Sequence, residues 1–150
     1  MRKERECGCV KKIGILTFHK SVNYGSVLQA FALSDLLSKR GYDVEIIDYE
    51  PASYSTQYRI FEENTTIHNI AANIRRLSVF DILWKQKKGF EQFREKYLPM
   101  SSYKFTKSSS AQEFSKYYDV VICGSDQIWN VTAKDCDPIF FLPGKQSYKK

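Results

Sequence analysis

The fold is decided by the stretch KKIGILTFHKSVNYGSVLQAFALSDLLSKRGYDVEIIDY, residues 11–49. Its first eight residues form an apolar run with polar flanks, which is typical of a strand buried on both faces of a sheet. Residues 25–40 carry apolar side chains at steps of one, three and four, which predicts a helix with one apolar face. Residues 43–49 predict a second strand. Two strands joined by a helix within about 40 residues form a βαβ unit, so we expect them to be parallel.

Polar residues at both ends of this helix supply its start and stop signals. Asn23 is a good N-cap, because its side-chain oxygen accepts hydrogen bonds from free N–H groups of the first turn. Gly41 suits the position just past the helix, where the backbone often turns left-handed. The loop over residues 19–24 therefore leads from the first strand directly into a helix N-terminus.

Strands and helices continue to alternate in the rest of the chain. Residues 67–98 carry two amphipathic helical stretches that end before Pro99, and residues 108–116 predict a short helix. Residues 118–123, YDVVIC, are the clearest strand after the first, and residues 139–142 predict a fourth strand. We expect an α/β domain with a mostly parallel sheet, in a three-layer Rossmann-like arrangement.

Length and composition are those of a soluble single-domain protein. The chain has 150 residues, of which 43% are hydrophobic and 27% charged, and its mean hydropathy is −0.44. Its apolar runs are far shorter than the ~20 residues that cross a bilayer, and its N-terminus lacks the apolar core of a signal peptide. We expect a basic tail over residues 1–11, one domain over residues 12–150, and a cytoplasmic location that includes the inner face of the membrane.

The net charge of +6, from 23 basic and 17 acidic residues, leaves two interpretations open. It favours an anionic partner such as a nucleic acid, a phosphorylated small molecule or an anionic membrane surface. It also fits a thin spread of charge whose only effect is solubility. A nucleic-acid-binding module that stacks bases on its many Tyr and Phe rings is the weaker alternative, because no recognised motif of that kind is present.

Four cysteines occur, at positions 7, 9, 123 and 136, and their spacing does not predict a metal site. Cys7 and Cys9 are separated by one residue and no second pair follows, whereas a structural zinc site needs two pairs of Cys or His ligands. Cys123 ends an apolar run and is most simply a small buried hydrophobe. We expect reduced thiols, as in a cytosolic protein, and no metal ligands.

Ligands of parallel α/β sheets bind beyond the carboxyl ends of the strands, which draws attention to the loop over residues 19–26. Its helix N-terminus offers free amides and a favourable dipole to an anion, and Gly25 permits close approach. Neither the dinucleotide fingerprint G-x-G-x-x-G nor the P-loop pattern is present, so NAD is not expected. The alternative is that Asn23 to Ser26 form only a capped turn.

We expect the strand that ends at Cys123 to lie beside the strand that ends at Phe18, so that the loops after them converge. The second of these loops, GSDQIWN over residues 124–130, combines a carboxylate, amides, a hydroxyl and an indole. Such planar polar groups beside an aromatic face suit a sugar, whose hydroxyls need hydrogen-bond partners and whose C–H face packs on a ring. Asp126 would act as a general base toward a hydroxyl if burial raised its pKa. The alternative is that Asp126 caps a helix and Trp129 fills the core.

Three stretches resemble the polysaccharide pyruvyl transferase family. They are VNYGSVLQAFAL (residues 22–33), FREKYLPMS (residues 93–101) and YDVVICGSDQIWN (residues 118–130). The similarity spans most of residues 12–143. It implies the N-terminal half of a GT-B-type fold, in which two Rossmann-like domains face each other across a cleft, so we expect the second domain to lie outside this chain.

The same resemblance implies a transferase that moves a pyruvyl group from phosphoenolpyruvate to a sugar of a cell-surface or exopolysaccharide, as a ketal. Phosphoenolpyruvate is then the donor substrate, and no cofactor or metal is needed. The expected partners are a sugar or lipid-linked saccharide acceptor and the second domain. Two alternatives stay open: a GT-B-like glycosyltransferase that uses a nucleotide sugar, and a truncated domain that is inactive alone.

Roles for residues of the two loops follow from this resemblance. Asp126 is the candidate that orients or deprotonates an acceptor hydroxyl, and His19 is the candidate that donates a proton or binds phosphate. Around the first loop and helix, substrate contacts are expected from Asn23, Tyr24, Gly25, Ser26 and Gln29. In the second loop they are expected from Gly124, Ser125, Gln127, Trp129 and Asn130.

Overall fold

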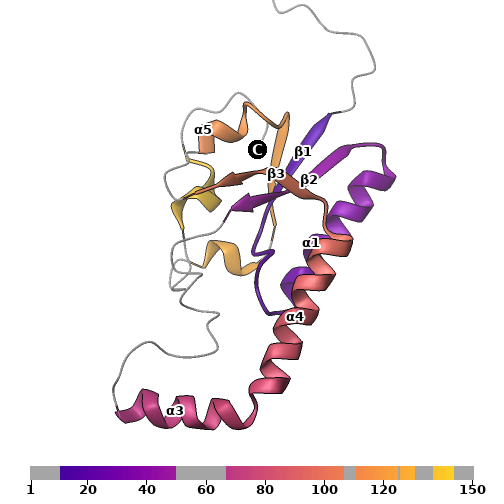
Figure 1. The fold of residues 1–150 in the computed structure, drawn as a ribbon. Helices are drawn as coiled ribbons and strands as arrows, with labels where there is room; N and C mark the ends of the chain where they lie inside the picture. Colours follow the sequence, from indigo (N-terminus) through magenta and orange to yellow (C-terminus); the bar gives the residue numbers. More distant parts are fainter. Residues whose placement is uncertain (1–10, 50–66, 107–110, 125, 131–136, 144–150) are drawn as a thin grey trace, which may run out of the picture.

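The computed structural model describes residues 11–49, 67–106, 111–124, 126–130 and 137–143 (Figure 1). Most of the predicted basic tail lies outside these residues, and so does Ser125. Within them, four parallel strands form one sheet in the order β3-β2-β1-β4. This sheet, with helices packed on it, confirms the predicted α/β Rossmann-like class.

The predicted βαβ unit is confirmed. Strand β1 (Lys12–Leu16) pairs in parallel with β2 (Asp43–Tyr49), and helix α1 (Tyr24–Lys39) connects them. Strand β4 (Val120–Cys123) pairs with the other side of β1. Because β1 lies between two neighbours, its side chains are buried on both faces, as its continuous apolar run predicts.

Both predicted end signals of α1 are confirmed. The Asn23 side-chain oxygen accepts hydrogen bonds from the N–H groups of Gly25 (2.8 Å) and Ser26 (3.4 Å). Gly41 follows the helix with a φ of 85°, in the left-handed region that side chains disfavour. The chain therefore leaves α1 in the direction that starts β2.

The prediction of a strand over residues 139–142 is wrong. Residues Pro138–Phe141 form a 3₁₀ helix, η2, whose first turn is capped by Asp137 through a 3.1 Å hydrogen bond from the Ile139 N–H. Pro fits the first position of a helix and cannot donate to a strand ladder, so the Asp-Pro pair favours this outcome. The fourth strand is instead β3 (Met100–Phe105), which begins directly after Pro99.

Helices α3 (Ile67–Ser78) and α4 (Phe80–Tyr97) confirm the helical prediction for residues 67–98, and α5 (Ala111–Phe114) confirms the short helix. Two hydrophobic clusters are present, and alternate residues of β1 belong to different clusters because successive strand side chains point to opposite faces. Ile15 packs in the cluster that α1 completes, whereas Leu16 packs in the cluster that η2 and a further 3₁₀ helix, η1 (Asp126–Trp129), complete. The sheet is therefore the middle of three layers.

Gly14 is held between two large side chains in β1. A Cβ atom at this position would lie 2.8 Å from Ile47 Cδ1 and 2.9 Å from the Tyr118 ring. We expect Gly14→Ala to lower the free energy of unfolding by about 1–3 kcal/mol, because the two side chains must move. Urea unfolding followed by circular dichroism measures the change.

Gly89 in α4 provides the control for this substitution. A Cβ atom there would meet no atom within 4 Å, so Gly89→Ala should be neutral or stabilise the helix by about 0.5–1 kcal/mol. Equal stability of Gly14→Ala and the unmodified chain would contradict the packing described for β1.

Candidate functional site

The two predicted loops leave the sheet at the same edge. In the β1–β4 pairing, Leu16 lies opposite Cys123, so the two strands end side by side. The N–H of Gly124 then donates a 3.1 Å hydrogen bond to the carbonyl of Leu16, which ties the start of the second loop to the end of β1. The expectation that both loops begin at one edge of the sheet is confirmed (Figure 1).

Helix α1 runs past the beginning of the second loop. A Cβ atom at Gly124 would lie 3.6 Å from Leu33 Cδ2 and 4.0 Å from the Gln29 side-chain nitrogen. Gln29 and Gly124, which are predicted from separate motifs, are therefore neighbours. A side chain at position 124 would fill the space in front of the Gln29 amide.

The hydrogen bonds at the start of α1 support the alternative of a capped turn rather than an open anion site. The Gly25 and Ser26 N–H groups both donate to the Asn23 side chain, and the Val27 N–H donates to the Asn23 carbonyl. These donors already have partners within the chain. Asn23 therefore contributes first to helix capping, and an anion would have to displace its side chain to reach the Gly25 and Ser26 amides.

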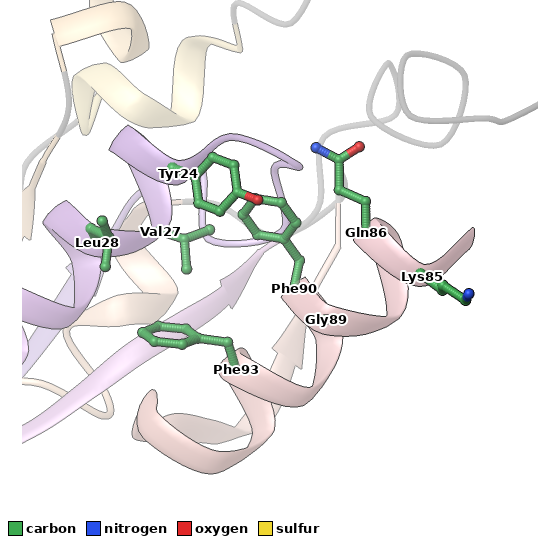
Figure 2. Close-up of a pocket in the computed structure, with 8 residues that line it drawn as sticks. All are labelled: Tyr24, Val27, Leu28, Lys85, Gln86, Gly89, Phe90 and Phe93. Atoms are coloured by element: carbon green, nitrogen blue, oxygen red, sulfur yellow. The ribbon is translucent and has the colours of Figure 1, made fainter. Parts of the chain in front are cut away.

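Tyr24 faces α4. Its ring lies against Phe90, with centroids 4.8 Å apart and planes inclined by 47°, although two thirds of the residue remains exposed. The two rings line an open hollow of about 400 Å³ between α1 and α4, which Figure 2 shows together with Phe93. Its other lining residues are Val27, Leu28, Lys85, Gln86 and Gly89. In this structure Tyr24 belongs to that largely apolar hollow.

The second loop continues as a 3₁₀ helix, η1 (Asp126–Trp129). Ile128 is fully buried, whereas Trp129 is 54% exposed, so Ile128 and not Trp129 fills the core. Asn130 is also exposed. Trp129 and Asn130 are thus accessible to a ligand, while the positions of the Asp126 and Gln127 side chains are outside the described part of the structure.

His19 is buried, although a loop histidine is usually solvated. It is 1% exposed, its Nδ1 lies 3.2 Å from the carbonyl oxygen of Thr17, and its Nε2 lies 3.3 Å from Asp48 Oδ1. Both ring nitrogens thus face oxygen acceptors of the protein. His19 holds the start of its loop against the end of β2, and neither nitrogen is directed at solvent.

Asp48, which sequence reasoning did not assign to the site, is the anchor of this arrangement. Its carboxylate pairs with His19 and with Lys20, whose Nζ lies 2.7 Å from Asp48 Oδ1. The hydrogen bond with His19 outweighs the opposing effect of burial, and together with Lys20 it holds the pKa of Asp48 well below its ordinary value. Its place at the carboxyl end of β2, beside β1, is the signal that could have found it.

Two buried hydroxyls flank His19 along the chain. Within the described residues, Thr17 Oγ1 and Ser21 Oγ have no hydrogen-bond partner, although both residues are nearly inaccessible. A buried hydroxyl without a partner costs about 1–3 kcal/mol, so such groups are normally satisfied by the protein, a water or a ligand. We call Thr17, His19, Lys20, Ser21 and Asp48 the polar cluster.

The described residues contain no group of three or more His, Cys, Asp or Glu side chains placed to hold a metal ion. Cys123, at the end of β4, is not in a disulfide bond and is only partly buried. Among the helices that the structure describes, none is both long and apolar enough to cross a membrane.

Asp48→Asn tests the polar cluster through stability. The amide carries no charge to pair with the Lys20 ammonium and is a weaker acceptor for His19, so we expect the free energy of unfolding to fall by about 1.5–3 kcal/mol at neutral pH. A carboxyl group with a lowered folded-state pKa contributes stability that is present above its unfolded pKa and is lost as the pH falls through its folded pKa. Urea unfolding should therefore show that the difference in unfolding free energy between the unmodified chain and Asp48→Asn becomes smaller below about pH 4.

Asp35→Asn is the control for this pH dependence. Asp35 pairs with Lys39 at 2.7 Å on the exposed surface of α1, where such pairs contribute roughly 0.3–0.5 kcal/mol. Its substitution should change stability little at any pH. An Asp48→Asn chain as stable as this control at neutral pH would show that the buried contacts do not stabilise the fold.

Together, the parallel sheet and the two loops at its carboxyl edge define a Rossmann-like α/β domain with a candidate ligand site at the strand ends. Residues 23–148, which include the first motif from Asn23 onward and the whole second motif, match the family model for polysaccharide pyruvyl transferase. The chain belongs to the polysaccharide pyruvyl transferase family. No curated protein and no solved structure matches it.

Proposed function

We propose that this domain takes part in the transfer of a pyruvyl group from phosphoenolpyruvate to a sugar of a polysaccharide, which leaves a cyclic ketal. The observation that supports it most is the pairing of β1 with β4, because it brings the two loop motifs of a family member to one edge of the sheet. The acceptor is a saccharide, free or lipid-linked.

The chemistry requires a proton donor, a base and cationic or polar support for phosphate. Protonation of C3 of the enol makes C2 electrophilic, with oxocarbenium character, and the oxygen of a sugar hydroxyl bonds to C2 as its proton leaves. A second hydroxyl of the same sugar then bonds to C2 while the C2–O bond to phosphate breaks, and the proton of that hydroxyl passes to the base or to the departing phosphate. The products are the ketal and inorganic phosphate, so the enzyme must stabilise charge at C2 and on the leaving group.

Asp126 is our candidate for the base that orients or deprotonates the attacking hydroxyl. It begins η1 directly beyond β4, at the edge where both loops start. The exposed indole of Trp129 offers a face on which a sugar ring can pack. Asn130, Gln127 and the Gln29 amide then supply hydrogen bonds to hydroxyls that flank the reacting one.

For His19, the buried geometry supports a positioning role over direct proton transfer. A nitrogen of His19 would have to leave Thr17 or Asp48 before it could reach C3 of the donor. We propose that His19 and Asp48 fix the loop that carries Asn23 to Ser26, and that the unpartnered hydroxyls of Thr17 and Ser21 are open to a polar ligand.

A phosphate-release assay with phosphoenolpyruvate and a panel of acceptor saccharides tests this function. Release that depends on the acceptor, with a ketal detected on the product by mass spectrometry, is the expected result. Release of a nucleoside diphosphate from a nucleotide sugar, with no phosphate from phosphoenolpyruvate, would identify a glycosyltransferase instead. No turnover together with saccharide binding would identify a domain that needs a further part for catalysis.

A further inference from the structure

Helix α3 presents a continuous apolar stripe to solvent. Ile70, Ile74 and Leu77 are spaced by four and three residues, so they lie on one side of the helix. They are 48%, 60% and 62% exposed, which is unusual for three large aliphatic side chains in a row. Figure 1 shows α3 well away from the sheet, joined to it by the long helix α4. The stripe is therefore not part of the core.

More exposed apolar side chains follow at the start of α4, where Ile82 and Trp84, two residues apart, point to opposite sides of the helix. Val79, Ile82 and Trp84 are 42%, 67% and 52% exposed. The indole of Trp84 stacks on the ring of Phe80, with centroids 6.1 Å apart, which holds it in place at the surface. We call residues 67–89 the α3–α4 arm. Six large apolar side chains of this arm are thus exposed to solvent, in the part of the arm that lies away from the sheet.

The arm is also strongly basic. It contains Arg75, Arg76, Lys85, Lys87 and Lys88, with Asp81 as its single acidic residue. Arg75, Lys85 and Lys88 are exposed. On α3, Arg75 and Arg76 lie off the aliphatic stripe of Ile70, Ile74 and Leu77. An amphipathic helix with aliphatic side chains on one face and Arg or Lys on the other is the pattern that lies in the interface of an anionic bilayer.

We propose that the α3–α4 arm docks on an anionic membrane surface through α3, with Ile70, Ile74 and Leu77 inserted at the level of the headgroups and Trp84 close to them at the start of α4. Two contributions act together: burial of the aliphatic side chains, and attraction of the basic residues to the anionic headgroups. Long Lys and Arg side chains can place their charges among the headgroups while their stems cover apolar surface.

Charge favours a membrane over a second copy of the chain as the occupant of this face. A symmetric dimer through the arm would bring the same patch of both copies together. Basic residues outnumber acidic ones five to one on each arm, so two arms brought together would repel each other. Anionic lipid offers opposite charge over the whole length of the arm. This inference does not depend on the reaction proposed above.

Co-sedimentation of the chain with vesicles tests the proposal. We expect binding to phosphatidylcholine vesicles that contain phosphatidylglycerol, weaker binding at high salt, and little binding to phosphatidylcholine alone. Ile74→Asp should weaken the binding by roughly tenfold or more, because it removes an apolar contact and adds a charge repelled by the lipid. Leu36→Asp is the matched control, since Leu36 is a similarly exposed aliphatic residue on α1.

Tryptophan fluorescence gives a second, local readout. The chain has two tryptophans, so Trp129→Phe leaves Trp84 as the only emitter. Its emission should move to shorter wavelength with the anionic vesicles and stay unchanged with the zwitterionic ones. No shift and no binding, or equal loss in Ile74→Asp and Leu36→Asp, would overturn the proposal. A dimer in sedimentation that Ile74→Asp abolishes would overturn it too, in favour of a second copy.

Discussion

Asp126→Asn is expected to lower kcat for acceptor-dependent phosphate release by about 10²–10⁴-fold, which is the usual contribution of a general base. Asparagine keeps the size of the side chain and its capacity to hydrogen-bond, but it cannot take the proton from an acceptor hydroxyl. Because the loss concerns proton transfer, KM for the acceptor should change much less than kcat. Steady-state kinetics with phosphoenolpyruvate in excess separates the two parameters.

Asp119→Asn is the matched control, because Asp119 and Asp126 flank the same strand at opposite ends. Asp119 lies just before β4, at the end opposite Asp126, and its carboxylate accepts a 2.9 Å hydrogen bond from the Lys12 N–H on the exposed surface. Its substitution should leave kcat within a factor of about two, as for surface positions outside the site. If the Asp126→Asn enzyme folds and keeps its rate, Asp126 is not the base that we propose.

Phe140→Ala is expected to have the largest effect on stability, a loss of about 3–5 kcal/mol of unfolding free energy. Phe140 is 1% exposed, and its ring meets Phe18 edge-on at 5.1 Å and Tyr49 at 5.9 Å. These partners lie just beyond β1 and at the end of β2, so η2 supports the edge of the sheet from which the first loop starts. Truncation would leave a cavity under that edge.

The neighbouring Phe141 is 45% exposed, which makes Phe141→Ala a control with the same chemical change. We expect it to cost much less, about 1 kcal/mol or below, since little apolar area is lost from the core. Chemical denaturation of both variants measures the difference. Similar losses in the two variants would mean that η2 does not pack as described.

The parts of the fold with strong local signals could be predicted from the sequence. The apolar run of β1, the period of α1 and the end signals Asn23 and Gly41 all agree with the structure. So does the position of β4 beside β1, which places the two loops at one edge. In each case, local propensity and burial favour the same conformation.

Strand β3 and helix η2 show why other parts of the fold were not predicted correctly from the sequence. The sequence MSSYKF of β3 is mostly polar, because an edge strand has one neighbour and here buries only Ser101 and Phe105 fully. The run IFF in η2 is as apolar as a strand, and periodicity cannot separate the two over so few residues. The preceding Asp-Pro pair is the local signal that favours a 3₁₀ helix over a strand here.

The polar cluster depends on tertiary pairing that no local pattern reveals. Asp48 and His19 are 29 residues apart, and they meet because parallel pairing of β1 and β2 ends both strands at one edge. The burial of His19 follows from that contact. A histidine in a polar loop gives no sign of burial in the sequence, so the burial of His19 and its place beside Asp48 could only come from the structure.

The central claim is that the loops after β1 and β4 form one saccharide site, and a titration of the ¹⁵N-labelled chain with a panel of oligosaccharides tests it most directly. We predict that an accepted saccharide shifts backbone amides of residues 23–29 and 124–130 together, with a single dissociation constant. Shifts confined to one loop, or different constants for the two loops, would contradict the claim.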